Sequence, residues 1–263
     1  MSNEARGSRD EDGGSGQPSV KSVEKAFSIL SAFSGRDRFM SLAQISQAAG
    51  LDKSAVQRFT RTLCGLGYLE QDPSTRQYCL GRRVLGLSYE YLRTNSLIEK
   101  AAPVLIDLRR TVRERVDLTL RDGDEVVYVF RLQSKRETMQ AALIGRRVPM
   151  FCSAGGRAIL SRMPREEASS VIQATNRRRI TPMTLIDPDA IMHEVDTARE
   201  RGFAVQNQEW RLDEIVAAAA ILDTDGRPVA AVHIAASTTE WDVVEFSERM
   251  GPLVAAAAQD VQH

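Results

Sequence analysis

A row of hydrogen-bond donors without an acidic partner runs along one side of residues 51–63, LDKSAVQRFTRTL. If this segment is helical, Val56, Phe59 and Leu63 fall on the opposite side and would face a core. The donor side consists of Lys53, Ser54, Gln57, Arg58 and Arg61. Glutamine can read adenine and arginine can read guanine through paired hydrogen bonds, whereas lysine and serine more often hold phosphate. The spacing therefore indicates a helix that contacts nucleic acid, with a solvated helix face as the alternative.

Two further helices are predicted before this candidate helix. Residues 22–33, SVEKAFSILSAF, repeat apolar residues at helical spacing, and we expect the inward face to consist of Val23, Ala26, Phe27, Leu30 and Phe33. In the second segment, SLAQISQAAG, Ser41 and Gln44 have capping-box spacing and Gly50 suits a helix end. Ser22 would cap the first helix and Asp52 the third.

A hairpin is predicted directly after the three helices. Residues 67–81, GYLEQDPSTRQYCLG, alternate apolar and polar residues around a Pro-Ser-Thr turn, and Arg76 lies at its tip. Three short helices closed by a hairpin predict a winged helix-turn-helix over residues 20–82. In that arrangement the third helix enters the DNA major groove, and Arg76 reaches a neighbouring groove or phosphate.

Charge is distributed unevenly along the chain. The whole sequence has 35 basic and 35 acidic residues, whereas residues 20–82 contain nine basic and five acidic ones. Local basic patches, not the total charge, govern attraction to nucleic acid. Residues 1–19 contain almost no apolar side chain and predict a disordered tail.

The composition is that of a soluble globular protein, with 43% hydrophobic and 27% charged residues. Apolar runs such as residues 215–222 are too short to span a bilayer, and the acidic, Gly/Ser-rich start is unlike a signal peptide. The three cysteines are far apart and form no CxxC pair, which indicates reduced thiols. We therefore expect a cytoplasmic protein with no membrane partner.

The second half of the chain predicts an α+β domain with an antiparallel sheet over residues 97–263, joined to the first by a linker helix at 83–96. Ser96 would cap the next helix. Strands are expected at VDLTLR, VVYVFRL, QAALI, FAVQ, VAAAAIL and VAAVHIA. Helices are expected near 154–162, 165–175, 187–201 and from Asp242 onward.

A candidate ligand site lies at residues 152–158, CSAGGRA. Ser153, Ala154, Gly155 and Gly156 would begin a helix, where main-chain N–H groups and the helix dipole attract anions. Small residues there also let a ligand approach closely. The alternative is that the glycines only permit tight packing of the helix on the sheet.

In the order and spacing of its motifs the chain resembles the IclR family of bacterial transcription regulators. These motifs are LDKSAVQRFTRTLCGLGYLEQDPSTRQYCLG, RVLGLSYEYL, VPMFCSAGGRAILS, RGFAVQNQEW and AAAAILDTDGRPVAAVHIAAS, over about residues 20–260. The resemblance implies a winged helix, a dimerising linker helix and a GAF-like C-terminal effector domain. It also implies a homodimer or homotetramer on a semi-palindromic double-stranded DNA operator.

The same resemblance places the effector cavity at Ala154 and Gly155. The chain departs from the family at Gln206 and Asn207, where two acidic residues are frequent, and at Asp213 and Ile215. We expect an effector site formed by Met150, Cys152, Ser153, Ala154, Gly155, Asn207, Trp210, Ala220, His233 and Ala235. Alanine and histidine where serine or cysteine is common predict a wider, less polar pocket for a bulkier carboxylate, such as an aromatic one. A structural role for His233, and an interface role for Trp210, stay open.

An enzyme is the main alternative, and a metabolite-independent architectural DNA binder is another. The three histidines show no metal-ligand spacing, and no GxSxG elbow, P-loop or dinucleotide fingerprint is present. Asp187 and Asp189 fit a helix cap, and Cys152 has no paired base. We predict a ligand-responsive transcriptional regulator, with no catalytic site, metal or cofactor. We expect a repressor, although nothing in the motifs distinguishes repression from activation.

Overall fold

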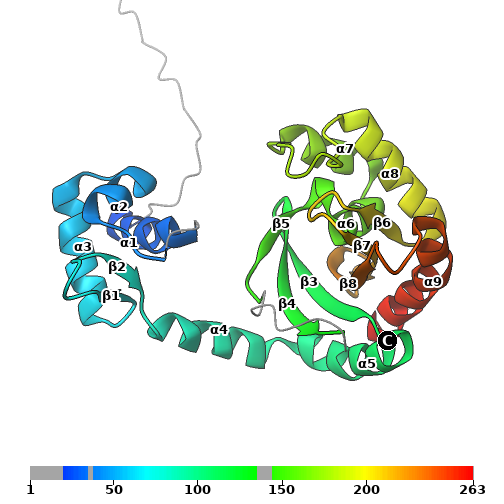
Figure 1. The fold of residues 1–263 in the computed structure, drawn as a ribbon, viewed down its shortest axis with the longest axis horizontal. Helices are drawn as coiled ribbons and strands as arrows, with labels where there is room; N and C mark the ends of the chain where they lie inside the picture. Colours follow the sequence, from blue (N-terminus) through cyan, green and yellow to red (C-terminus); the bar gives the residue numbers. More distant parts are fainter. Residues whose placement is uncertain (1–19, 35–37, 135–143, 263) are drawn as a thin grey trace, which may run out of the picture. The chain divides into compact units, whose positions relative to one another are not determined.

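The computed structural model describes residues 20–34, 38–134 and 144–262. The chain divides into two compact units, one ending at Tyr91 and the other beginning at Leu92 (Figure 1). The tail expected at 1–19 lies outside the described residues, as does most of the strand expected at QAALI. Each unit has a hydrophobic core of its own.

The N-terminal unit is a winged helix-turn-helix. Its elements are α1 (Lys21–Ser31), the 3-10 turn Ala32–Ser34, α2 (Leu42–Ala49), α3 (Lys53–Gly65), β1 (Leu69–Gln71) and β2 (Tyr78–Leu80). The caps expected for α2 and α3 are confirmed: Ser41 and Gln44 form a capping box, and Asp52 accepts a hydrogen bond from the Ala55 N–H. The cap expected at Ser22 is wrong, because α1 already begins at Lys21, with Val20 at the cap position. Gly50 ends α2 with a φ of 65°, a conformation that glycine adopts without strain.

The predicted inward face of α1 is partly wrong. Val23 and Phe27 are 51% and 61% exposed, whereas Ile29, which the prediction left out, is fully buried. Leu30 and Phe33 do pack against the core, as expected. The apolar stripe of α1 is wider than the surface that α2 and α3 cover, so its composition alone could not show which part is buried.

The division between the units falls within α4 (Arg83–Thr94), and α5 (Ser96–Val112) follows it inside the second unit. In α4 no residue is buried, and Leu85, Leu87, Tyr89 and Tyr91 are each more than half exposed. The next helix, α5, is capped by Asn95 instead of the predicted Ser96. The Asn95 Oδ1 accepts hydrogen bonds from the N–H groups of Leu97 and Ile98, because Ser96 already has helical backbone geometry.

The C-terminal unit is built on an antiparallel sheet. Within the described residues this sheet has six strands, in the order β5-β4-β3-β8-β7-β6. The strands are β3 (Arg115–Asp122), β4 (Glu125–Leu132), β5 (Arg147–Pro149), β6 (Ala204–Asn207), β7 (Glu214–Leu222) and β8 (Pro228–Ser237). The helices are α6 (Ala154–Ser161), α7 (Arg165–Ala174), α8 (Pro188–Arg201) and α9 (Val243–Gln262), close to the predicted ranges. The predicted α+β class with an antiparallel sheet is confirmed.

The helices cover both faces of this sheet (Figure 1). One core lies between the sheet and α6, α7 and α8, and the other between the sheet and α5 and α9. Along β7, alternate alanines face different cores: Ala218 the first, Ala217 and Ala219 the second. A strand buried on both faces reads as a continuous apolar run, which explains IVAAAAIL at residues 215–222.

A buried ion pair fixes α6 to the loop after β6. The Arg157 guanidinium donates to both carboxylate oxygens of Glu209, at 2.6 and 2.7 Å, and to the Phe151 carbonyl at 3.0 Å. The second Glu209 oxygen also accepts from the Leu185 N–H at 3.0 Å. Both charged side chains are almost completely buried, so their hydrogen bonds offset the desolvation of the two charges.

We expect Glu209→Ala to lower the free energy of unfolding by about 3–5 kcal/mol, because it leaves the Arg157 charge buried without its counterion. Glu245→Ala, which removes an exposed pair with Arg249, should cost about 1 kcal/mol or less. Urea denaturation at one fixed protein concentration measures both. Equal losses in the two variants would contradict a special role for the Arg157–Glu209 pair.

Candidate DNA-binding and effector sites

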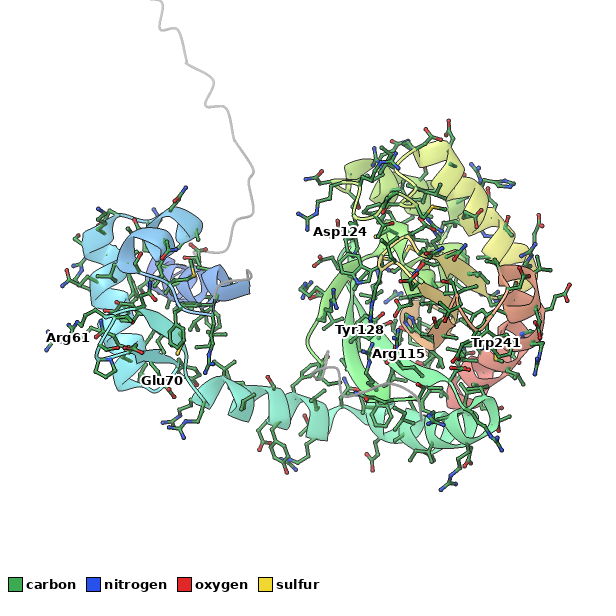
Figure 2. All side chains as sticks on the ribbon, viewed as in Figure 1. Arg61, Glu70, Arg115, Asp124, Tyr128 and Trp241 are labelled. Atoms are coloured by element: carbon green, nitrogen blue, oxygen red, sulfur yellow. The ribbon has the colours of Figure 1, made fainter. Side chains whose placement is uncertain are left out.

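The five predicted donors of α3 are all exposed, and the opposite side of the helix is buried. Val56 is fully buried and Leu63 nearly so, while Arg61 points outward from the unit (Figure 2). The Ser54 hydroxyl donates to the Asp52 carboxylate at 2.7 Å. The Ala55 N–H and this hydroxyl lower the pKa of Asp52. Ser54 therefore serves the helix cap as well as the exposed surface.

Arg58 differs from Arg61 in its surroundings. It lines a hollow of about 360 Å³ together with Ser22, Lys25, Phe59 and Thr62. The hollow combines two cationic side chains with the first turn of α1, where the helix dipole is positive. That combination suits a phosphate group better than a base edge.

Arg76 lies at the tip of the hairpin, as predicted, and is exposed. Its backbone has a φ of 59°, which is uncommon for a residue other than glycine. The turn is held by Asp72, whose carboxylate accepts from the Ser74 hydroxyl and from the N–H groups of Ser74 and Thr75. These hydrogen bonds, led by the Ser74 hydroxyl, lower the pKa of Asp72 to about 2. The carboxylate therefore stays ionised and holds the tip in shape.

In the C-terminal unit, His233 lies directly against the start of α6. The Ser153 hydroxyl caps this helix by accepting from the Gly156 N–H at 3.2 Å. A Cβ atom added to Gly155 would lie 2.3 Å from the His233 Cε1, so only glycine fits there. The His233 Nε2 is 2.8 Å from the Thr119 Oγ1. The wider pocket expected at this point is absent from the described residues, because the imidazole fills the space.

Four further predicted residues are core residues here. Met150, Cys152, Ala154 and Ala220 belong to the core between the sheet and α6–α8, and each is less than 9% exposed. Burial raises the pKa of the Cys152 thiol to about 12. Because a thiol must lose its proton to act as a nucleophile, Cys152 is inert near neutral pH.

Trp210 and Ala235 line a cavity of about 650 Å³ at one end of the sheet. Its wall includes Arg115 at the start of β3, Glu214 at the start of β7, and residues 210–213 of the loop between β6 and β7. The Arg146 guanidinium lies 5.2 Å from the centre of the Trp210 ring. The cavity thus combines an aromatic wall, beside which Arg146 lies, with groups of both charges: the lining holds the guanidinium groups of Arg115 and Arg211 and the carboxylates of Glu114, Asp213, Glu214 and Glu240.

A buried charge network, which sequence reasoning missed, lies beside this cavity. Arg115 donates to Asp117 at 2.9 Å and pairs with Glu214 at 2.7 Å, and Arg131 pairs with Asp117 at 2.6 Å. Tyr128 lies within the same cluster, and burial raises its pKa, so the phenol keeps its proton. The alternation Arg115, Asp117, Thr119 along one strand could have indicated that these polar side chains share an inward face.

Asn207 is separated from the other predicted effector residues. It pairs in register with Ile215, which belongs to the core on the α5 and α9 side, whereas His233 pairs with Ala218 of the opposite core. Asn207 and His233 therefore lie on opposite faces of the sheet, and Asn207 lines other cavities.

The described parts of the chain contain no group of His, Cys, Asp and Glu side chains that could hold a metal ion. Among the described helices, none is both long and apolar enough to cross a membrane.

The free energy of unfolding should decrease as the pH is lowered below about 6.5, because of His233. Burial, with the nearby Arg115 and Arg131 charges, lowers the pKa of His233 to about 3. An unfolded histidine titrates near pH 6.5, so between these values the unfolded chain binds a proton that the folded chain does not. The contribution of His233 to the free energy of unfolding is fully present above about pH 6.5, and it decreases by about 1.4 kcal/mol per pH unit as the pH falls below that value.

His233→Gln, whose amide can keep the contact with Thr119, should flatten this slope, whereas His193→Gln on the surface should leave it unchanged. Urea denaturation at several pH values above about 5, where carboxyl groups do not yet titrate, separates the variants. An unchanged slope in His233→Gln would show that the histidine is not buried in its neutral form.

The N-terminal and C-terminal units match two family models. Residues 22–73 match the IclR helix-turn-helix domain, and residues 89–263 match the bacterial transcriptional regulator IclR C-terminal domain. The regulator KdgR of Escherichia coli K12 is 29% identical over 239 residues, which cover 91% of this chain and 90% of KdgR.

Solved structures agree. A transcriptional regulator from Rhodococcus sp. RHA1 is 28% identical, with a TM-score of 0.76 over 93% of this chain and 97% of that one. An IclR homologue from Microbacterium hydrocarbonoxydans, solved with 4-hydroxybenzoate, has the same fold, with 22% identity and a TM-score of 0.72 over 92% and 97% of the two chains. These relatives are regulators, not enzymes, and the chain belongs to the IclR family of DNA-binding bacterial transcriptional regulators.

Proposed function

We propose that this regulator acts in the cytoplasm, binds a double-stranded operator as a homodimer or homotetramer, and responds to a small aromatic carboxylate through its C-terminal unit. The observation that carries the proposal is the donor row of α3, exposed on a helix whose other side is buried. Lys53, Ser54, Gln57, Arg58, Arg61 and Arg76 are the proposed DNA contacts.

The cavity beside Trp210 is the proposed effector site. Its volume of about 650 Å³ lies within the usual range for small-molecule sites. The indole ring of Trp210 would stack on an aromatic ring, and the Arg146 guanidinium beside that ring would attract a carboxylate. Arg115 would bind the carboxylate only by giving up part of its pairing with Asp117 and Glu214. The binding of 4-hydroxybenzoate by a relative of the same fold supports this class of ligand.

In this proposal, predicted residues other than Trp210 shape the site through their packing and do not contact the effector. His233 and Gly155 are closely packed and set the position of α6 against the sheet, and Ala235 leaves room at the cavity wall. Asn207 takes no part, since it lies on the opposite face of the sheet.

Helix α4 is the proposed dimer contact. Four of its large apolar residues are exposed: Leu85 and Tyr89 on one side of the helix, and Leu87 and Tyr91 on another, because residues four apart share a side. Exposed apolar side chains of this kind are suited to pairing with the same helix of a second copy. Pairing would hold two copies of α3 at a fixed spacing on two half-sites. If an effector changes that spacing, DNA must change effector affinity by the same factor.

The DNA contacts should differ in kind. Arg61→Ala should cost about 1–3 kcal/mol on the operator and relax base preference at one position. Arg58→Ala should weaken binding to all sequences alike and lower the salt slope by about one, because it faces phosphate. Fluorescence anisotropy on operator duplexes at several salt concentrations measures both. Lys100→Ala on α5 serves as a control of equal charge, and identical profiles for the two arginine variants would refute the assignment.

The effector proposal predicts that benzoate and 4-hydroxybenzoate shift operator affinity, whereas cyclohexanecarboxylate and acetate, which have the same charge without an aromatic ring, do so weakly. Trp210→Ala should raise the half-maximal concentration about five- to tenfold, because ring stacking is lost. The same anisotropy assay with each acid gives the readout. If the protein binds its operator specifically but no acid changes the affinity, the proposed DNA contacts stand and the aromatic carboxylate proposal is refuted. That outcome would also favour an architectural role.

A further inference from the structure

The outer edge of β6 is the end of the sheet. The Gln208 N–H donates to the Glu214 carbonyl, so the pairs that exchange main-chain hydrogen bonds with β7 are 206 with 216 and 204 with 218. The main-chain N–H and C=O groups of Val205 and Asn207 therefore point away from β7. Among the described residues no strand pairs with them, and this edge can accept an added strand.

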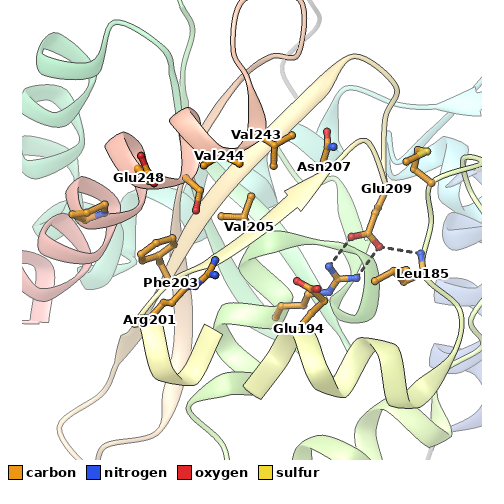
Figure 3. Close-up of a pocket in the computed structure, with 14 residues that line it drawn as sticks. Leu185, Glu194, Arg201, Phe203, Val205, Asn207, Glu209, Val243, Val244 and Glu248 are labelled. Atoms are coloured by element: carbon orange, nitrogen blue, oxygen red, sulfur yellow. Dashed lines mark hydrogen bonds and ion pairs between the residues drawn. The ribbon is translucent and has the colours of Figure 1, made fainter. Parts of the chain in front are cut away.

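Two adjoining cavities follow this edge. One of about 530 Å³ lies between β6, α8 and α9, with Phe203, Val205 and Asn207 at its floor (Figure 3). The second, of about 440 Å³, continues past Asn207 along residues 238–243. Asn207 and Val243 line both cavities. We call the combined hollow the β6 groove; its length along a strand edge fits an extended chain better than a compact ligand.

Asn207 presents an unsatisfied acceptor in the groove. Its Oδ1 atom is buried and has no hydrogen-bond partner among the described residues. Buried polar atoms in folded proteins nearly always have a partner. A peptide that pairs with β6 carries main-chain N–H donors along the same edge, so it could satisfy Oδ1 as well as the main chain of Val205 and Asn207.

The lining of the groove is mainly acidic, which favours a basic occupant. Its lining includes five carboxylates against two guanidinium groups: Glu194, Glu209, Glu240, Asp242 and Glu248, with Arg157 and Arg201. Arg157 is already paired with Glu209. Two copies of the chain that paired through β6 would bring two acidic rims together, which disfavours a second copy. Phe203 and Val205 supply apolar floor for alternate side chains.

We propose that the β6 groove binds an extended segment of a partner protein that alternates apolar and basic residues and adds to the sheet as a strand beside β6. The apolar side chains would pack on Phe203 and Val205, and the basic ones would pair with the carboxylates of Glu194 and Glu248 at the rim. This surface is separate from the proposed effector cavity and does not depend on the identity of the effector.

The test uses the full chain and a blocked peptide of about seven residues that alternates lysine and valine. Hydrogen exchange at the Val205 and Asn207 amides, resolved by NMR, reports occupation of the edge. Both amides should exchange quickly in the protein alone, at low and high protein concentration, and slowly once the peptide is bound. The Val216 amide, already bonded within the sheet, should not change.

Charge-reversing variants test the chemistry. Glu194→Lys combined with Glu248→Lys should weaken the lysine peptide about five- to tenfold and favour its glutamate counterpart. Glu200→Lys, exposed on α8 outside the groove lining, should behave as the wild type. Unchanged exchange at Val205 and Asn207 with saturating peptide overturns the proposal. If the Val205 and Asn207 amides become protected as the protein concentration rises, without peptide, the proposal is overturned in favour of a second copy of the chain. Equal affinities for the lysine and glutamate peptides would refute the basic partner.

Discussion

The buried ion pair between Arg157 and Glu209 connects the parts of the C-terminal unit that matter for function. It ties α6, whose first turn faces His233, to the loop that carries Trp210. The carboxylate of Glu209 also binds the N–H of Leu185, so the segment before α8 is held by the same group. Since a buried charge without its partner is strongly destabilising, the pair allows few alternative positions for this loop. The cavity beside Trp210 and the β6 groove therefore both have walls held in place by this pair.

The sheet separates two environments that the sequence places side by side. Its α6 face holds His233, Tyr128 and the paired charges of Arg115, Asp117 and Glu214, while the other face is packed with apolar residues of α5 and α9. Paired charges in a closed interior keep their hydrogen bonds only if each partner is correctly oriented. A ligand that approaches Arg115 would compete with these bonds, which is a physical route from binding to movement of β3 and β7.

The N-terminal unit and α4 show a different use of apolar residues. Ile29 and Val56 close the core beneath the hairpin, yet Val23, Phe27 and the apolar residues of α4 lie on the surface. Burial of such residues contributes about 25 cal/mol per Å² of apolar surface, a gain that one copy of the chain leaves unused. Pairing with another copy would recover it, as the proposed homodimer requires.

The sequence by itself determined the order of the elements other than β5, which it did not predict, the caps at Ser41 and Asp52, and the exposed donor row of α3, because these depend on residues a few positions apart. It did not determine which part of the α1 stripe is buried, because that depends on how α2 and α3 pack. Nor could it show that His233 fills the space at Gly155, that Asn207 faces the other core, or that Arg115 and Glu214 meet. Those contacts join residues distant in the chain through sheet register, and only the tertiary structure decides register.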